Sequence, residues 1–458
     1  MARAKKEAAL TPEERLQAAL VPDWEWPYKL PKNWCWTTVG AINQYVGISA
    51  DPTKAKNKTF ELYSVPSSAD NYPEIVLGAD IGSTKQSVKK GDVLLCKINP
   101  RINRVWKVSK YTDHSLLASS EWIVIRNSGL ISNYLMWCFR SPYFRGYMLS
   151  NVSGVGGSLM RAQPKFVQGY PVPVPPLAEQ QRIVDRIESL FAKLDEAKEK
   201  AQAVVDSFET RKAAILHKAF TGELTAKWRE EHGVGMESWH LRTIGEVCEN
   251  VKVGIVIKPS QYYVPQNEGT PAFRSANVRE CRIDDFDWVY LNEKGMKDNS
   301  RSIVHTGDVL VVRSGNPGTA CVVPERFDGY NAIDILIAVP NKKIIISDYL
   351  CYYTNSPLGK KTVEIGKRGI ALTHFNVKGF SQMPINIPTI PEQVVIVRTL
   401  GDLFAQEQQS KEAAEAVLDQ IDLMKKSILA RAFRGELGTN DPSEESAVEL
   451  LKEIIRRG

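Results

Sequence analysis

Basic and amide side chains gather just after two matching apolar runs, one beginning at Gly91 and the other at Gly307. More of them lie late in each half of the chain, in stretches rich in glycine. Arginine and asparagine can bind the edges of guanine and adenine through paired hydrogen bonds, and lysine mostly holds the phosphate backbone. Each residue alone would equally suit an ordinary surface charge or turn. Together they predict contacts with double-stranded DNA from Lys97, Arg101, Arg104, Lys107, Arg161, Gln163, Arg274, Arg313, Asn316, Lys367, Arg368 and His374.

Sequence motifs for catalysis are missing from the chain. It has no G-x-x-x-x-G-K-[ST] loop of the kind that cradles ATP phosphates. Neither Asn99-Pro100 nor Asn316-Pro317 continues into the Asn-Pro-Pro-aromatic motif of an adenine amino-methyltransferase. The six histidines show no spacing typical of metal ligands. The sequence therefore favours a non-enzymatic binding protein with no metal and no cofactor of its own.

A segment in the middle of the chain recurs near its end, and each copy has the pattern of a long amphipathic helix. Residues 179–224 align with residues 392–437 without a gap, with 21 identities in 46 positions. Each copy follows a variable segment of about 160 residues, so the chain is two copies of one module. The variable segments share only short sequences, such as Gly91-Asp-Val-Leu94 with Gly307-Asp-Val-Leu310. A repeated fold with divergent sequence predicts two recognition domains for different targets.

Apolar residues on each repeated helix are spaced by alternating steps of three and four, which is typical of a coiled coil. Arg211 interrupts the first series, and Glu407 and Ser410 interrupt the second. The simplest way to bury both series is an antiparallel pair with a domain at each end, about 60 Å long for 40 residues. One such helix alone would equally suit a homodimer. The predicted contact residues are Ile183, Ile187, Leu190, Leu194, Val204, Phe208, Ile215, Ile396, Leu400, Leu403, Val417, Ile421 and Ile428.

Charge and composition agree with a binding protein that meets a polyanion. The 458 residues carry a formal net charge of +6, and residues 23–176 hold 18 Lys and Arg against 10 Asp and Glu. Phosphate neutralisation by such an excess releases counterions and adds affinity. No apolar run is long enough to cross a membrane, and the charged N-terminus does not match a signal peptide. The seven scattered cysteines are expected to be reduced thiols, so we expect a cytoplasmic protein without a membrane partner.

The ends of the repeated helix carry a family resemblance. The sequence PPLAEQQRIV opens the first copy, and AFTGEL and AFRGEL close the two copies. With these motifs the chain closely resembles, over nearly its whole length, the specificity subunit of type I restriction-modification enzymes. The resemblance implies two target-recognition domains, each reading one half of a bipartite, asymmetric DNA sequence. It also implies a helical spacer that docks partner subunits.

The same resemblance assigns the chemistry to partners. Methylation of adenine would belong to two modification (methyltransferase) subunits, and ATP-dependent cleavage to restriction (translocase) subunits. S-adenosylmethionine, ATP and Mg are therefore expected on those subunits and not in this chain. No fixed base-contact motif of the family can be matched to positions of this sequence.

These observations predict an α+β protein with a pseudo-twofold internal repeat, in which two long antiparallel helices separate two globular mixed α/β domains. A helix over residues 12–20 is expected because Thr11, Pro12 and Glu14 form an N-cap and capping box. The expected parts are an N-terminal helical tail (1–22), domain 1 (23–176), spacer helix 1 (177–224), a linker with domain 2 (225–391), spacer helix 2 (392–437) and a C-terminal helical tail (438–458).

Two other classes of protein compete with this interpretation. One is a non-catalytic scaffold that binds proteins or another polyanion and uses its helices to dimerise. The other is a degenerate enzyme with its own methyl transfer, which the missing motif disfavours. Sequence-specific, salt-dependent binding of duplex DNA would separate recognition from a scaffold.

Overall fold

The computed structural model describes residues 11–154, 160–368 and 375–457, and for residues 364–368 it describes the backbone alone. The chain divides into two compact units. Unit 1 holds the residues up to 200 together with those from 417 onward, and unit 2 holds residues 201–416. We call residues 23–176 head 1 and residues 239–391 head 2.

Head 1, in unit 1, is a mixed α/β domain with two main sheets. A five-stranded sheet has the order β2 (Ser49–Ala50), β5 (Lys85–Ser87), β8 (Ser115–Ala118), β3 (Thr59–Tyr63) and β4 (Glu74–Leu77). A three-stranded sheet has the order β7 (Val105–Lys107), β6 (Val93–Cys96) and β9 (Trp122–Ile125). The remaining elements are β1 (Cys35–Thr38) paired with β12 (Pro171–Val174), β10 (Val152–Ser153) paired with β11 (Arg161–Ala162), and the helices α2 (Val39–Ile42), α3 (Ser132–Arg140), α4 (Pro142–Ser150) and α5 (Pro164–Val167).

Head 2, in unit 2, repeats much of this plan. One four-stranded sheet has the order β14 (Cys248–Val253), β23 (Ile335–Pro340), β20 (Val309–Val312) and β21 (Ala320–Val322). Another has the order β15 (Tyr263–Val264), β19 (Val289–Leu291), β16 (Thr270–Phe273) and β22 (Asn331–Ala332). The remaining elements are β13 (His240–Thr243) with β24 (Pro384–Ile387), β17 (Val278–Arg279) with β18 (Arg282–Ile283), and α9 (Ile244–Val247), α10 (Glu293–Asp298), α11 (Ser347–Asn355), α12 (Pro357–Arg368) and α13 (Val377–Ser381).

The central strand of each head is wholly apolar and buried on both faces. Side chains alternate between the faces of a strand. In β6, Val93 and Leu95 therefore pack with the core around α3, whereas Leu94 and Cys96 pack with a second cluster that contains Trp106. In β20, alternate residues divide between two clusters in the same way. This shared core frame fixes the turn that follows each strand.

Two helix pairs repeat as well, and their capping explains why. Ser141 and Ser356 each precede a proline that opens α4 or α12. The Ser141 hydroxyl accepts from Phe144 N at 3.3 Å, and the Ser356 hydroxyl accepts from Gly359 N at 3.1 Å. A serine N-cap followed by proline at the first helical position is a strong helix start. The predicted fold class, repeated α+β domains with long helices, is confirmed.

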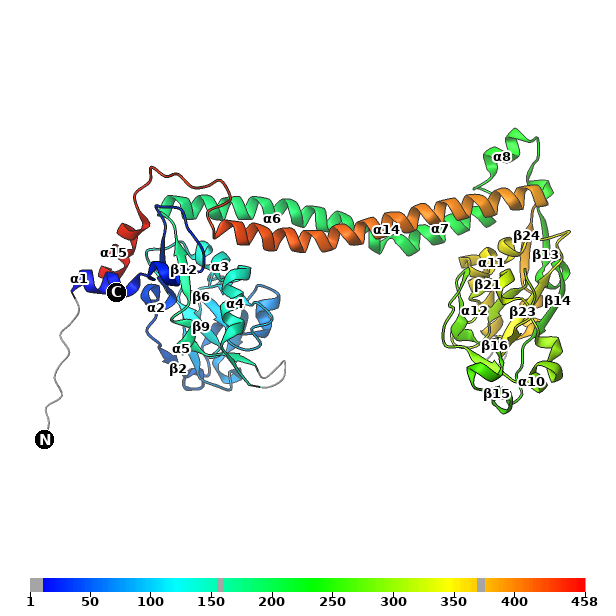
Figure 1. Ribbon diagram of the computed structural model, residues 1–458, viewed down its shortest axis with the longest axis horizontal. Coiled ribbons are helices and arrows are strands. Elements are labelled where there is room, and N and C mark those ends of the chain that lie inside the picture. The colour runs from blue at the N-terminus through cyan, green and yellow to red at the C-terminus, as the bar shows by residue number, and fades with distance from the viewer. Residues whose placement is uncertain (1–10, 155–159, 369–374, 458) are drawn as a thin grey trace. The chain divides into compact units, whose positions relative to one another are not determined.

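The long helices are α6 (Leu177–Asp206), α7 (Phe208–Phe220) and α14 (Ile390–Ala432). In unit 1, Asp195 contacts Lys425 at 2.5 Å, whereas the earlier Arg182 contacts the later Thr439 O at 3.0 Å. In unit 2, Arg211 contacts Glu407 at 2.7 Å, and the later Lys411 places its ammonium 4.8 Å from the ring centroid of the earlier Phe208. Within each unit the segments are therefore antiparallel, and Figure 1 shows the end of α14 beside α6 and its beginning beside α7.

The first spacer helix differs from its prediction as one continuous helix, because it is interrupted at Ser207. The Ser207 hydroxyl donates to Ala203 O at 2.5 Å, and the Arg211 guanidinium donates to Val204 O at 3.2 Å. Side chains that bond these carbonyls compete with the helical hydrogen bonds of the backbone.

The predicted coiled-coil residues differ in how deeply they are buried. Ile183 and Ile187 belong to the core of head 1, and Ile396 and Leu400 to the core of head 2, so the start of each helix packs on the head that precedes it. Ile421 is also buried. Val417 contradicts the expected seam, because it is 42% exposed. The other predicted positions are half-buried: Leu190, Leu194, Val204, Phe208, Ile215, Leu403 and Ile428.

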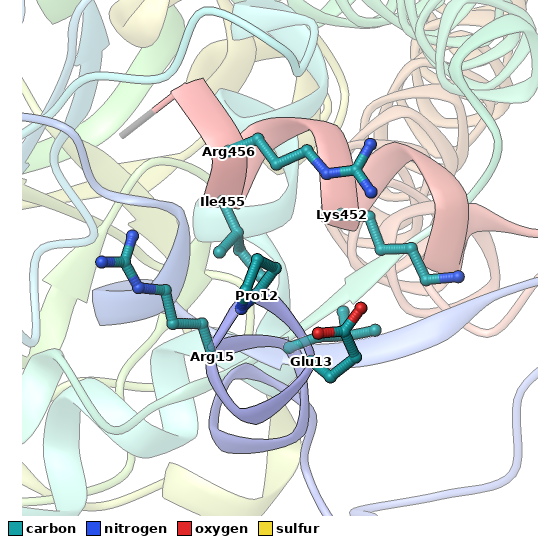
Figure 2. A pocket seen from close by; sticks show the side chains of 7 residues that line it. Pro12, Glu13, Arg15, Lys452, Ile455 and Arg456 are labelled. Atoms are coloured by element: carbon teal, nitrogen blue, oxygen red, sulfur yellow. The ribbon is translucent and has the colours of Figure 1, made fainter. Parts of the chain in front are cut away.

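The terminal helices of unit 1 lie side by side. Helix α1 (Pro12–Ala19) begins at the predicted Thr11 cap, and α15 (Ala447–Arg457) buries Ala447, Leu451 and Ile454 against head 1. A cavity of about 200 Å³ lies between these helices. Figure 2 shows Arg15, Lys452 and Arg456 among its lining residues. Among the predicted DNA contacts whose side chains the structure describes, none lines this cavity. Within the described residues, no helix is both long and apolar enough to cross a membrane.

Candidate nucleic-acid interface

The turn after β6 in head 1 brings two cations to one carboxylate. Lys97 directly follows β6, and Glu121 directly precedes the neighbouring strand β9. The Lys97 amide donates to Glu121 O at 3.1 Å, so the antiparallel pairing continues beyond the named strands. The Glu121 carboxylate lies 3.9 Å from Lys97 Nζ and 3.3 Å from an Arg161 guanidinium nitrogen. Lys97 and Arg161, predicted separately, therefore meet in one cluster.

A third chain segment completes this cluster in head 1. Ala162 N donates to Lys97 O at 2.8 Å, and Asn99 N donates to Met160 O at 2.8 Å. Asn99 has a φ of 44°, a left-handed conformation that asparagine tolerates better than most residues. Two buried acceptors here, Asn99 Oδ1 and Glu121 Oε2, have no hydrogen-bond donor among the described residues. The cluster therefore keeps acceptor capacity for a ligand.

Head 2 builds the same arrangement from other residues. Arg313 directly follows β20, and Asp334 directly precedes β23, the antiparallel neighbour of β20. Their side chains form an ion pair at 3.1 Å. The Ser314 hydroxyl also donates to the Asp334 carboxylate, at 3.3 Å. Phe375 N donates to Arg313 O at 3.3 Å, as Ala162 N does to Lys97 O in head 1.

The correspondence between the two turns extends to the backbone. Two residues after the cation, Asn99 in head 1 and Gly315 in head 2 both have positive φ, 44° and 85°. Gly315 reaches this region without steric cost because it has no Cβ. The two heads therefore present a cation and an acid at the same place on the same frame, although the residue types differ.

Each head is anchored to its following helix by a repeated buried carboxylate. Glu179 accepts from Trp34 Nε1 at 2.7 Å and from Asn440 Nδ2 at 2.9 Å in unit 1. Glu392 accepts from Trp239 Nε1 at 3.0 Å and from Arg229 at 2.7 Å in unit 2. Both glutamates are 0% exposed. A buried charge is stable only when it is paired and hydrogen-bonded, so these contacts fix each head on its helix.

The glutamine after each glutamate repeats a second set of contacts. Gln180 accepts from Ile131 N at 3.0 Å and donates to Pro175 O at 3.0 Å. Gln393 accepts from Ile346 N at 2.9 Å and donates to Pro388 O at 2.9 Å. The Glu-Gln pair at the start of each repeated helix is thus a docking element, which explains its identity in both copies.

Three other predicted contacts in head 1 have different surroundings. Lys107 lies at the opposite end of the sheet from Lys97, because it pairs with Val93, and its ammonium donates to Asn133 Oδ1 at 2.5 Å. Arg101 is exposed on the turn, and its carbonyl accepts from Arg145. Arg104 is half-buried before β7. The structure therefore separates Lys107 from the basic cluster in which it was predicted.

The remaining predicted contacts are scattered or lie outside the description. Arg274 follows β16 in another sheet and is bound to Asp287 at 2.7 Å. Asn316 is exposed on the turn after Arg313, and Gln163 is half-buried before α5. Lys367 and Arg368 end α12, but their side chains are outside the described residues, and His374 lies outside them entirely.

Sequence reasoning missed the acids Glu121 and Asp334. Each stands one residue before an apolar strand that pairs with the cation-bearing strand. This shared position before an apolar strand was the signal that the sequence offered. It could be used only with knowledge of which strands pair. Among the described residues, no group of three or more His, Cys, Asp or Glu side chains could hold a metal ion.

This combination defines a class of protein: paired antiparallel helices that carry two repeated α+β heads, each with a charged turn. Residues 236–417 match the family model of the type I restriction modification DNA specificity domain. The chain is 26% identical over 354 residues to the EcoKI specificity subunit of Escherichia coli K12, covering 72% of this chain and 73% of the relative. It is 25% identical over 346 residues to the StySPI specificity subunit of Salmonella potsdam, covering 70% and 71%.

Solved structures agree with the fold. The crystal structure of the HsdS subunit from Thermoanaerobacter tengcongensis superposes with a TM-score of 0.66 and 22% identity, covering 90% of this chain and 100% of that one. A chain from a structure of type I R-M complex assembly gives a TM-score of 0.69 at 22% identity, with the same coverage. Residues 236–417 thus match a type I restriction modification DNA specificity domain, and most of the chain is similar to type I restriction enzyme specificity subunits.

Proposed function

We propose that this chain gives a type I restriction-modification complex its DNA sequence specificity, and that it is not itself an enzyme. Each head reads one half of a bipartite, asymmetric target. The observation that carries this proposal is the charged turn, which both heads place at the same point of the same frame with different residues. Arg313 and Asn316 in head 2 differ in reach and hydrogen bonding from Lys97 and Arg161 in head 1, so the two half-sites should differ in sequence.

Catalytic chemistry belongs to partner subunits in this proposal. Two modification subunits would bind S-adenosylmethionine and methylate adenine, and restriction subunits would use ATP and Mg. The chain contributes the positions at which those subunits meet DNA. Its place of action is the cytoplasm, where the DNA of a restriction-modification host lies.

The long helices would set the spacing between the half-sites. Helix α14 has 43 residues, which corresponds to roughly 65 Å at about 1.5 Å per residue. Ion pairs at Asp195–Lys425 and Arg211–Glu407 hold the antiparallel register within the two units. We expect two read segments whose centres lie about one turn of DNA apart, separated by unread base pairs.

Exchange of most of head 1 tests the proposal. Residues 33–176 are replaced by the corresponding segment of another family member, and the selected DNA sequence is compared with that of the wild type. One half-site should change while the other and the gap remain. A change in both half-sites would mean that the heads do not read independently.

Duplex selectivity separates this function from the scaffold alternative. The full chain should bind one bipartite duplex far more tightly than a scrambled duplex of equal length, and both affinities should fall with salt. A single contiguous footprint, or equal affinity for all duplexes at every salt concentration, would favour the scaffold.

A further inference from the structure

Each head carries one acid beside the cation that directly follows its central strand, Glu121 beside Lys97 and Asp334 beside Arg313. We infer that Glu121 and Asp334 are specificity-determining residues, and that each acid, together with its cation, reads a G·C base pair in its half-site. This inference rests on the proposed function. It adds residues that the basic character of the heads does not suggest, because a carboxylate near DNA is electrostatically costly unless it binds a base.

The chemistry of a G·C pair matches the two groups. In the major groove, guanine offers the acceptors N7 and O6, and its cytosine partner offers the N4 amino donor beside them. In head 2, the guanidinium of Arg313 and the carboxylate of Asp334 lie 3.1 Å apart, so a donor and an acceptor stand side by side. Arginine binds guanine, and aspartate accepts from cytosine N4.

Head 2 holds the arginine in position and leaves it hydrogen-bonding capacity. The Arg313 side chain is 16% exposed, whereas Asp334 is 45% exposed. Arg313 Nε is buried and has no acceptor among the described residues. A buried donor without a partner costs about 1–3 kcal/mol, so a ligand that supplies an acceptor removes that cost. The Arg313 guanidinium therefore has one hydrogen bond left to make, which a base edge can accept when the side chain swings out of the turn.

Head 1 pairs its acid with two cations instead of one. Glu121 stands between Lys97 and Arg161. Its Oε2 atom lies 3.9 Å from Lys97 Nζ, too far for a hydrogen bond, and is a buried acceptor that receives none from the described residues. The neighbouring Asn99 Oδ1 is a second such acceptor. Acceptors that await donors suit an amino group such as cytosine N4. A cation and an acid thus stand together in both heads, and the unfilled hydrogen bond lies on the cation in head 2 and on acceptors in head 1.

The acid also restrains binding to the wrong DNA. In the unbound protein it neutralises the cation and repels phosphates, which lowers sequence-independent affinity. On the correct base pair the cation and the acid both form hydrogen bonds, so the acid costs the specific complex little affinity. An acid that merely supported the turn would affect specific and non-specific binding alike. Replacement of an acid that reads a base should raise the affinity for non-specific DNA and lower the affinity for the specific target.

Isosteric replacement tests the inference. The full chain, co-expressed with its modification subunit, is used to select from a pool of randomised duplexes as the wild type, as Asp334→Asn and as Glu121→Gln. Each variant should lose a G·C preference of about tenfold at one position of one half-site. The two variants should affect different halves. Affinity for a scrambled duplex should rise in both.

Matched controls use exposed acids of the same heads that form ion pairs elsewhere. Glu293→Gln in head 2 removes a partner of Lys297, and Asp113→Asn in head 1 removes a partner of Lys110. Both controls should leave the selected sequence and the scrambled-duplex affinity unchanged. Thermal unfolding of every variant shows whether the fold is retained, so that a misfolded variant is replaced by Asp334→Ser or Glu121→Ser.

The outcomes separate this inference from the proposed function. A wild type that selects no bipartite sequence would overturn the proposed function and the inference with it. A wild-type sequence that both folded acid variants also select, with unchanged preferences, would overturn the inference alone. Loss of preference at all positions of both half-sites would mean that the acids support the heads structurally, and this too would overturn the inference.

Discussion

Glu392 is the residue whose removal should cost unit 2 the most stability. It is 0% exposed and accepts from Thr225, Arg229 and Trp239, and Arg229 is itself buried. Glu392→Ala leaves the guanidinium without its partner, which should lower the free energy of unfolding by about 3–5 kcal/mol. Urea denaturation measures this, with Glu293→Ala as an exposed control that stays close to wild type. Equal stability of the two variants would contradict the anchoring role.

Cys281 should be the most reactive thiol of the chain. It is exposed, whereas the other six cysteines are buried. A hydrogen bond from the Cys351 thiol at 3.7 Å, together with the nearby Lys212 ammonium, lowers the pKa of Cys281. Burial raises the pKa of Cys35, Cys248 and Cys321 to about 12.

A lowered pKa means that Cys281 is thiolate at a lower pH than an ordinary cysteine, and the thiolate is the nucleophile. Alkylation by a maleimide should therefore show one fast phase, whose rate rises with pH and reaches its plateau at a lower pH than that of an ordinary thiol. The fast phase should vanish in Cys281→Ser. A fast phase that survives this substitution would show that another thiol is exposed in solution.

At the scale of the elements, Arg211 and Glu407 should fix the register of α7 against α14. Each interrupts the apolar series of its own helix, and the two bind each other at 2.7 Å. Polar partners within a coiled coil specify register at some cost in stability. Because both side chains are partly exposed, loss of the ion pair in Arg211→Glu should lower the free energy of unfolding by only about 1 kcal/mol. Repulsion between the new carboxylate and Glu407 would add to this loss.

The double variant Arg211→Glu with Glu407→Arg should recover most of this loss, because the pair is restored in reverse. Thermal denaturation of the two single variants and the double variant measures the coupling. Losses that simply add in the double variant would show that the two residues act independently.

Most elements were predictable because local chemistry determines them. The Thr11 capping box gives α1, and the apolar spacing of residues 179–224 and 392–437 gives the long helices. The interruption at Ser207 was not predictable from apolar spacing, because it arises from side-chain bonds to backbone carbonyls. Arg211 and Glu407 were recognised only as separate interruptions, since their contact joins positions 196 residues apart.

In the candidate site too, contacts between residues far apart in the sequence could not be predicted. Lys97, Arg161 and Arg313 were predicted from residue type and position, whereas Lys107 was grouped wrongly because the antiparallel strand β7 carries it to the other end of the sheet. Glu121 and Asp334 were missed because strand pairing brings them to their cations. The sequence separation of cation and acid also differs between the heads, so no common spacing reveals the pair.

At the scale of the whole molecule, the helices should act as the ruler of the target. Four residues inserted after Lys200 and four after Ala416 lengthen both helices by about one turn, or roughly 6 Å. The unread gap should grow by about two base pairs while both half-sites keep their sequences. Selection from randomised duplexes measures both quantities.

An insertion after Lys200 alone serves as the contrasting variant. It shifts the apolar series of one helix against the other, so it should weaken binding instead of lengthening the gap. An unchanged gap after the matched insertion would argue that the helices do not set the spacing.

The most direct test of the central claim is to co-express this chain with its modification subunit and map N6-methyladenine in the host DNA by single-molecule sequencing. We expect one bipartite, asymmetric methylated motif with an unread gap, which disappears when this chain is omitted. A stable complex of active subunits that methylates no such motif, or a motif that persists without this chain, would contradict the claim that the chain supplies sequence specificity.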